Sequence, residues 1–131
     1  MTTYITAQIQ AMASPDQPNY IYKISPTPPP EPVPAIYPPS ELDEKDGFIH
    51  LSTAAQVPRT ADLFFAEAPH LWFVKIQVER LVPLHRIEWG PTGCVSLYGE
   101  VTASDIVAIE SYQRDGEKSW AETLMNGKWL E

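Results

Sequence analysis

Residues 47–65 read GFIHLSTAAQVPRTADLFF and predict a strand followed by a capped helix. The apolar run of residues 48–51 is typical of a strand, and the two hydroxyl residues after it can cap a helix. We expect this helix to run from residue 54 to about residue 65. Four of its side chains are spaced to face a core: Val57, Ala61, Phe64 and Phe65.

Further runs of β-branched and aromatic residues predict strands on both sides of this unit. Residues 71–78, LWFVKIQV, form the strongest run, and we expect them at the centre of a sheet. Residues 84–89 and 94–101 predict a hairpin across the turn sequence of residues 90–93. The remaining predicted elements are a strand at residues 20–24, an alternating run at 106–112, and a closing helix at 120–125 that is capped by Ser119 and ended by Asn126-Gly127.

Short strands, one firm helix and few alternating strand–helix units favour an α+β fold. We expect a curved, split antiparallel sheet with the helix of residues 53–65 packed on it. The length of 131 residues fits a single domain, 1–131, in which residues 1–19 are an N-terminal extension. A hydrophobic content of 44% is enough for a core in a chain of this size.

Ten of the fourteen prolines lie between Pro15 and Pro39. Because proline removes a backbone donor and keeps its predecessor extended, residues 25–40 are expected to form a polyproline-like surface loop within the domain. A lid over a substrate and a ligand for a proline-recognising module are the alternatives. The charged run of residues 41–47, ELDEKDG, is expected to end in a turn at Asp46-Gly47.

Seventeen acidic and nine basic side chains give a net charge of −8, which repels nucleic acid and anionic membranes. The sequence has no apolar run long enough to span a membrane, and its first residues lack the features of a signal peptide. Its one cysteine, Cys94, cannot form an internal disulfide. We therefore expect a soluble, cytoplasmic protein that binds a small molecule.

His50 is the first candidate for chemistry, because it interrupts an apolar strand just before Ser52 and Thr53. A strand-to-helix junction exposes helix N-terminal amides, so these three residues could hold a phosphate, a carboxylate or a ribose hydroxyl. The structural alternative is a histidine bonded to backbone beside an ordinary helix cap.

Glu88 is the second candidate, because a carboxylate flanked by Ile87 and Trp89 could lie in a partly apolar cleft and act as a general acid or base. A surface carboxylate or a member of an ion pair is the alternative. The three histidines have no metal-binding spacing, and the sequence contains no phosphate-binding glycine motif and no serine-hydrolase elbow. We predict no metal site.

Residues 46–57, DGFIHLSTAAQV, with Thr60, Phe64 and Phe65 after them, resemble the family known as domain of unknown function 952 (DUF952). Supporting pieces follow the same order along the chain: residues 21–24, residues 71–78, Glu88, residues 97–99 and residues 115–116. The resemblance implies a compact relative of the ADP-ribosyltransferase fold, in which two small sheets surround a cleft. NAD is a candidate cofactor by that fold analogy alone.

The resemblance implies one cleft, in which His50 and Glu88 are the predicted catalytic residues. The predicted substrate-binding residues are Tyr22, Lys23, Ser52, Thr53 and Tyr98. Where the family usually has a proline-histidine pair before its Leu-Tyr-Gly sequence, this chain has Val95-Ser96. Three functions stay open: an enzyme acting on a nucleotide-like or other compact polar metabolite, a non-catalytic small-molecule-binding module, and an interaction protein that works through its proline-rich segment.

Overall fold

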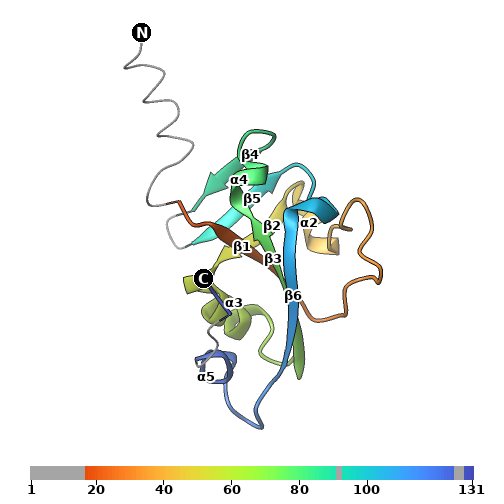
Figure 1. The fold of residues 1–131 in the computed structure, drawn as a ribbon. Coiled ribbons are helices and arrows are strands. Elements are labelled where there is room, and N and C mark those ends of the chain that lie inside the picture. The colour runs from red at the N-terminus through yellow and green to blue at the C-terminus, as the bar shows by residue number, and fades with distance from the viewer. Residues whose placement is uncertain (1–16, 91–92, 126–128) are drawn as a thin grey trace.

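The structure is a computed structural model that describes residues 17–90, 93–125 and 129–131. In these residues, six strands form one antiparallel sheet in the order β4-β5-β2-β1-β3-β6 (Figure 1). The strands are β1 (Tyr20–Ser25), β2 (Ile49–Thr53), β3 (His70–Gln77), β4 (Arg86–Trp89), β5 (Cys94–Tyr98) and β6 (Ile106–Gln113). The helices are α2 (Glu41–Asp46), α3 (Val57–Phe64), α4 (Val78–Leu81) and α5 (Trp120–Leu124), with short 3-10 helices η1 (Ala54–Gln56) and η2 (Ala103–Asp105). The predicted α+β class is confirmed.

The strongest predicted strand is confirmed within one residue as β3, which pairs with β1 on one side and β6 on the other. The predicted hairpin is confirmed as β4 and β5, paired from Arg86 with Tyr98 to Trp89 with Val95. Part of its turn, residues 91–92, lies outside the described residues, as do residues 126–128 at the predicted end of the closing helix and residues 1–16 of the predicted extension.

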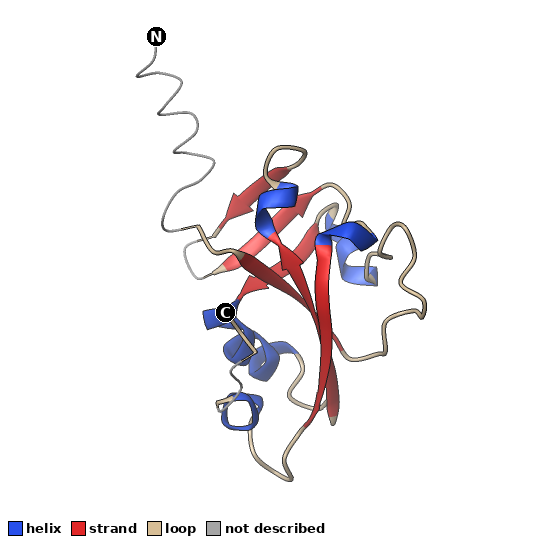
Figure 2. Ribbon diagram, viewed as in Figure 1, coloured by secondary structure: helices blue, strands red, loops and turns tan. Residues whose placement is uncertain are grey.

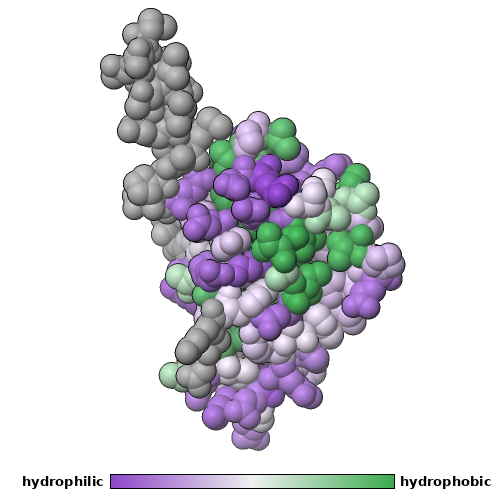
Figure 3. All heavy atoms as spheres, viewed as in Figure 1, coloured by the Kyte–Doolittle hydropathy of each residue, from purple (hydrophilic) through white to green (hydrophobic). Residues whose placement is uncertain are grey.

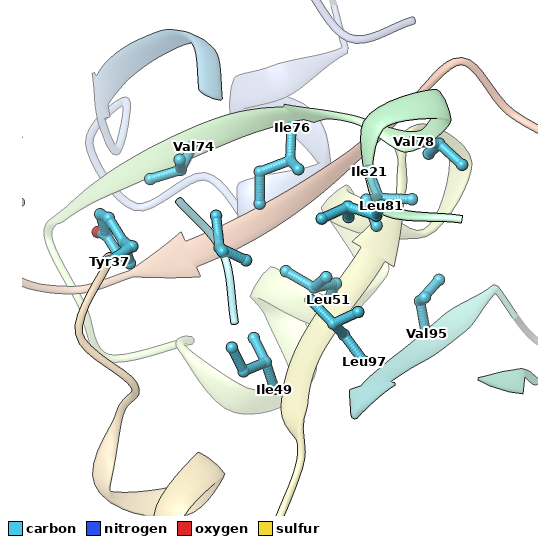
Figure 4. Close-up of a cluster of buried hydrophobic side chains, with 11 residues drawn as sticks. Ile21, Tyr37, Ile49, Leu51, Val74, Ile76, Val78, Leu81, Val95 and Leu97 are labelled. Carbon is cyan, nitrogen blue, oxygen red and sulfur yellow. The ribbon is translucent and has the colours of Figure 1, made fainter. Parts of the chain in front are cut away.

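Two apolar clusters pack on the two faces of the sheet, because successive strand residues point to opposite sides. One cluster contains Ile21, Leu51, Val74 and Leu97, which come from the neighbouring strands β1, β2, β3 and β5 (Figure 4). The other lies under α3 and α5, which cover one side of the sheet in Figure 2. These helices are held together where Asp62 accepts the backbone N–H of Trp120 at 2.6 Å.

The prediction that Phe64 faces the core is wrong, since this residue is 72% exposed. Helix α3 ends at Phe64, and Phe65 leaves helical geometry with φ −131° and ψ 28°. The change of direction turns Phe65 toward the cluster under α3, where Val57 and Ala61 are fully buried as expected. The prediction failed at Phe64, the last residue of α3, whose side chain extends into solvent.

Residues 41–47, which were expected only to end in a turn, form helix α2 and its C-terminal cap. The side chain of Ser40 accepts the backbone N–H of Asp43, and Asp43 accepts the backbone N–H of Ser40, which is a capping box. Gly47 ends the helix with φ 80°, a left-handed conformation that favours glycine. The predicted turn residue Gly47 is therefore a helix C-cap.

The proline-rich segment of residues 25–40 contains no helix in the structure, and its last third is anchored to the domain. The backbone N–H of Tyr37 donates to the carbonyl of Val101 at 2.8 Å, and Ile36 bridges to Thr102. Tyr37 is only 8% exposed and belongs to the first apolar cluster. The segment is thus a loop with one buried aromatic anchor.

The face of the molecule in Figure 3 is mostly hydrophilic, with apolar side chains gathered in the region of β6. Val107 on β6 is 47% exposed. Among the helices of the described residues, none has the length and apolar character needed to cross a membrane.

Candidate functional site

The sheet separates between β1 and β2 after two residue pairs. The ladder joins Ile21 to Thr53 and Tyr22 to Ser52. In this register the next hydrogen-bonded pair would be Ile24 with His50. Instead, the His50 N–H donates to the carboxylate of Asp43, and the His50 carbonyl accepts from Lys23 Nζ. Two side chains thus replace the missing strand neighbour, and we call this place the β1–β2 split.

Asp43, on α2, is the centre of the β1–β2 split. Its Oδ2 accepts from Lys23 Nζ at 2.6 Å and from the Ser40 N–H at 2.9 Å. Its Oδ1 accepts from the His50 N–H at 2.9 Å and lies 2.7 Å from His50 Nδ1. Burial alone would raise the pKa of this carboxyl, but the hydrogen bonds from Lys23, His50 and Ser40 together lower the pKa to about 2.

Lys23, on β1, is the buried cation of the split. Its ammonium donates to Asp43 and, at 3.2 Å, to the His50 carbonyl. Burial lowers the pKa of Lys23 below its usual value, although the bond to Asp43 opposes this effect. Because its ammonium is buried against Asp43 and the His50 carbonyl, Lys23 holds these two residues in position. It does not form part of the exposed surface that a ligand could contact.

The imidazole of His50 lies between two carboxylates and is one-third exposed, with 34% of its side chain accessible. Nδ1 faces buried Asp43, while Nε2 lies 2.8 Å from Asp46, a residue at the end of α2 whose side chain is itself 37% exposed. An imidazolium donates through both nitrogens, whereas a neutral ring donates through one. Asp43 therefore orients the ring, and Asp46 covers the nitrogen nearer to solvent.

The strand register brings several predicted residues to the face that carries His50. His50 pairs with Ser96 on β5, and Ser96 pairs with Glu88 on β4, so the three form one row across the sheet. Opposed residues in a ladder share a face. Two strand spacings separate His50 from Glu88, which is about 10 Å.

Aromatic and charged groups extend this row. The ring of Phe48 lies 4.5 Å from that of His50 and 5.4 Å from that of Tyr98, centroid to centroid. The guanidinium of Arg86 lies 3.8 Å from the centre of the Tyr98 ring. Together with Ser96 and Glu88, these side chains form what we call the His50 face.

Glu88 lies on the His50 face, but its environment differs from the apolar cleft that its neighbours suggested. Its side chain is 57% exposed and pairs with Arg86 at 3.4 Å. This is the ion-pair alternative of the sequence analysis. Its predicted catalytic role stays a prediction.

The other predicted binding residues are placed apart from the exposed part of the His50 face. Tyr22 is fully buried and Ser52 is 5% exposed. The hydroxyls of Ser52 and Thr53 do not cap a helix as predicted. Thr53 precedes η1 without a side-chain cap bond, and α3 begins only at Val57. The predicted helix cap is therefore wrong, because a 3-10 turn separates the strand from the helix, and the anion site expected at this junction stays a prediction.

Sequence reasoning missed Asp43 and Asp46, which hold the His50 ring. The charged run around them predicted only a turn at Asp46-Gly47, although Ser40 three residues before Asp43 was a signal for a helix N-terminus. The link from this helix to His50 depends on tertiary folding. Among the described residues, no group of three histidine, cysteine or carboxylate side chains is arranged to hold a metal ion.

A hollow of about 230 Å³ lies next to the split, bordered by Asp43 and Phe48. Residues 36–39 and the chain just after β5 form other walls, and Glu44 and Glu100 also line it. Ligand pockets for larger molecules commonly measure ~300 to 1,000 Å³. The hollow suits only a compact ligand or one part of a larger one.

The fold and the site together define a small α+β domain with a split antiparallel sheet and an aspartate-oriented histidine beside the split. The chain belongs to the family described as Protein of unknown function (DUF952), which matches residues 32–109. The predicted family is confirmed.

Solved structures of protein CC0527 from Caulobacter crescentus are similar to this chain. Its crystal structure gives a TM-score of 0.60 at 23% sequence identity and covers 76% of this chain and 91% of that protein. Its solution NMR structure gives a TM-score of 0.63 at 23% identity and covers 87% of this chain and all of that one. At this identity the likeness shows the fold alone. No curated protein matches the sequence.

Proposed function

We propose that this protein is a small acid–base enzyme that acts on a compact polar metabolite, such as a nucleoside-like molecule, bound over the His50 face. One observation carries the proposal: the buried carboxylate of Asp43 lies 2.7 Å from Nδ1 of a histidine whose ring reaches solvent. A buried aspartate that orients a histidine in this way prepares the other nitrogen to accept or donate a proton.

Each group of the His50 face has a role in this proposal. A substrate hydroxyl takes the place of Asp46 at Nε2, since Asp46 is the more exposed of the two carboxylates on the ring. The flat rings of Phe48 and Tyr98 pack against a planar part of the substrate. Glu88 polarises the reacting centre from the far side of Ser96.

We further infer that the fold is a compact relative of the ADP-ribosyltransferase fold. The separation of β1 and β2 after two residue pairs supports this inference, because it divides the sheet into two halves. An enzyme of that class would bind its substrate between the two halves of the sheet, next to an acidic or basic side chain on one of the strands.

NAD, which this fold analogy implies, fits the His50 face poorly. A diphosphate needs cationic or amide donors. Lys23 is buried against Asp43, and Arg86 is paired with Glu88 and stacked on Tyr98. We therefore derive no step through NAD.

A binding module without catalysis is the second candidate, and Ser96 favours it. This hydroxyl lies directly between His50 and Glu88 in the register. The DUF952 resemblance places a histidine there, and a serine hydroxyl cannot replace an imidazole as an acid or base near neutral pH. Such a protein would bind the same ligand and leave it unchanged.

A thermal-shift screen tests the proposal, because a ligand that binds the native state raises the melting temperature. Nucleosides, mononucleotides and small hydroxy acids are tested on the wild type, on His50→Ala and on the matched control His70→Ala. His70 lies on β3, stacked on Trp72 at 4.2 Å. We expect a compound that stabilises the wild type and the control but not His50→Ala.

The compounds found are then incubated with the wild type and followed by NMR. Conversion that requires His50 supports the enzyme, and binding without conversion supports the module. A screen in which no compound acts, or in which every shift survives His50→Ala, contradicts both.

A further inference from the structure

Two polar side chains are buried side by side on β1 and β3, away from the exposed part of the His50 face. Tyr22 and Lys75 are register partners in the ladder. Tyr22 is fully buried, and Lys75 is 6% exposed. A buried ammonium is costly unless it is paired, and a buried phenol needs a partner for its hydroxyl.

One short segment, residues 129–131, supplies these partners. Lys75 Nζ donates to the Trp129 carbonyl at 3.2 Å and to the carboxylate of Glu131. The Tyr22 hydroxyl accepts the Glu131 backbone N–H at 2.8 Å. In the part of the chain that the structure describes, every hydrogen bond of these two side chains leads to this segment.

Aromatic contacts complete the arrangement. The ammonium of Lys75 lies 4.4 Å from the ring centre of Tyr20 and 5.4 Å from that of Trp129. Tyr22 and Trp129 meet edge to face at 5.5 Å. The segment therefore presents a ring, a backbone N–H, a carbonyl and a carboxylate to complementary groups on the sheet.

The segment is held by these contacts and by the packing of Trp129 and Leu130 against the apolar cluster under α3, and it is not part of the sheet. Trp129 and Leu130 are half-buried, and the Glu131 side chain is 59% exposed. A segment that occupies a site on its own chain competes with free peptides for that site. Its effective concentration is set by the stretch of chain that connects it to the site.

We propose that Tyr20, Tyr22 and Lys75 form a binding site for peptide segments in which an aromatic residue precedes an acidic residue by two positions, and that residues 129–131 occupy this site as an internal ligand. The site is independent of the proposed enzyme function. A segment of another protein with the same pattern would exchange with the internal one.

The test uses the full chain with the internal ligand weakened by the substitutions Trp129→Ala and Glu131→Gln together. The probe is the peptide acetyl-Trp-Leu-Glu-amide, added to isotope-labelled protein and followed by amide chemical shifts. We expect the double variant to bind the peptide at least ten-fold more tightly than the wild type does, with shifts centred on β1 and β3. The peptide acetyl-Trp-Leu-Gln-amide should bind at least ten-fold more weakly than the glutamate peptide.

Lys75 variants in the same double-variant background test the role of the ammonium. Lys75→Arg keeps a cation and should keep binding, whereas Lys75→Met should lose it. If the double variant does not fold, Glu131→Gln alone weakens the internal ligand without removing the tryptophan. A folded variant that ignores the peptide, or binding that survives Lys75→Met, overturns the proposal.

Discussion

Oδ1 of Asp43 accepts a hydrogen bond from the backbone N–H of His50 at 2.9 Å and also lies 2.7 Å from Nδ1 of the same residue. The two residues are seven positions apart and belong to consecutive elements, α2 and β2. A single carboxylate oxygen therefore sets the position of the strand and the orientation of the ring. The chemistry of His50 depends on the helix before it.

Asp43→Asn should lower the free energy of unfolding by about 3 kcal/mol, because it leaves the Lys23 ammonium buried without a charged partner. Urea unfolding at pH 7 measures the loss. Lys23→Met in the Asp43→Asn background should recover part of it. Asp115→Asn is the control, since Asp115 forms an exposed pair with Lys118 at 3.2 Å. Equal effects of Asp43→Asn and Asp115→Asn would contradict a stabilising role for the split.

Stability should fall in acid through Asp43. Its pKa is lowered from 3.8 in the unfolded chain to about 2 in the native state, so the folded protein binds the proton less well. This contribution, about 2 kcal/mol, is fully present above about pH 4 and is lost as the pH falls toward 2. Unfolding curves of the wild type and Asp43→Asn at several pH values should converge in this window. A constant difference between them down to pH 2 would show that Asp43 is not the titrating group.

Val74→Ala should destabilise the protein by about 2 to 3 kcal/mol, because the side chain is fully buried on β3 and its loss leaves a cavity. Phe64→Ala removes a larger side chain that is 72% exposed, and it should change stability by less than about 1 kcal/mol. Chemical denaturation of the two variants gives the comparison. The reverse order would mean that Phe64 is packed in the core and Val74 is not.

Gly93→Ala should cost more than Gly47→Ala, although both glycines have a left-handed backbone, with φ of 85° and 80°. A Cβ at Gly93 would lie 2.1 Å from Cγ of Gln56 and 2.7 Å from Oγ1 of Thr53, whereas a Cβ at Gly47 meets nothing within 4 Å. Gly47→Ala therefore reports the backbone penalty alone, about 1 to 2 kcal/mol. The melting temperature of Gly93→Ala should be the lower of the two. Equal melting temperatures would show that η1 moves aside freely.

Local patterns in the sequence predicted much of the sheet. β3 and the β4–β5 hairpin follow from runs of β-branched and aromatic residues, and α5 follows from its cap at Ser119. The charged residues of α2 gave no apolar periodicity, so only the cap residues at its two ends indicated a helix.

Only the part of the candidate site that a local sequence pattern marks could be predicted. His50 stands out because a strand rarely places a histidine among apolar residues, and the register then brings Ser96 and Glu88 beside it. Asp43 and Lys23 are 20 residues apart, and only the folded chain brings their side chains together. Nothing local marks that pair.

The split between β1 and β2 also bears on how the chain folds. One half of the sheet contains β4, β5 and β2, and the other contains β1, β3 and β6. In sequence order β2 lies between β1 and β3, and β3 lies between β2 and the β4–β5 hairpin, so neither half is a continuous stretch of chain. Each half forms only when strands far apart in the sequence pair with one another. Such long-range pairing is typical of topologies that fold slowly and in one cooperative step. No continuous fragment would therefore contain one half complete without strands of the other, and the two halves should be gained and lost together.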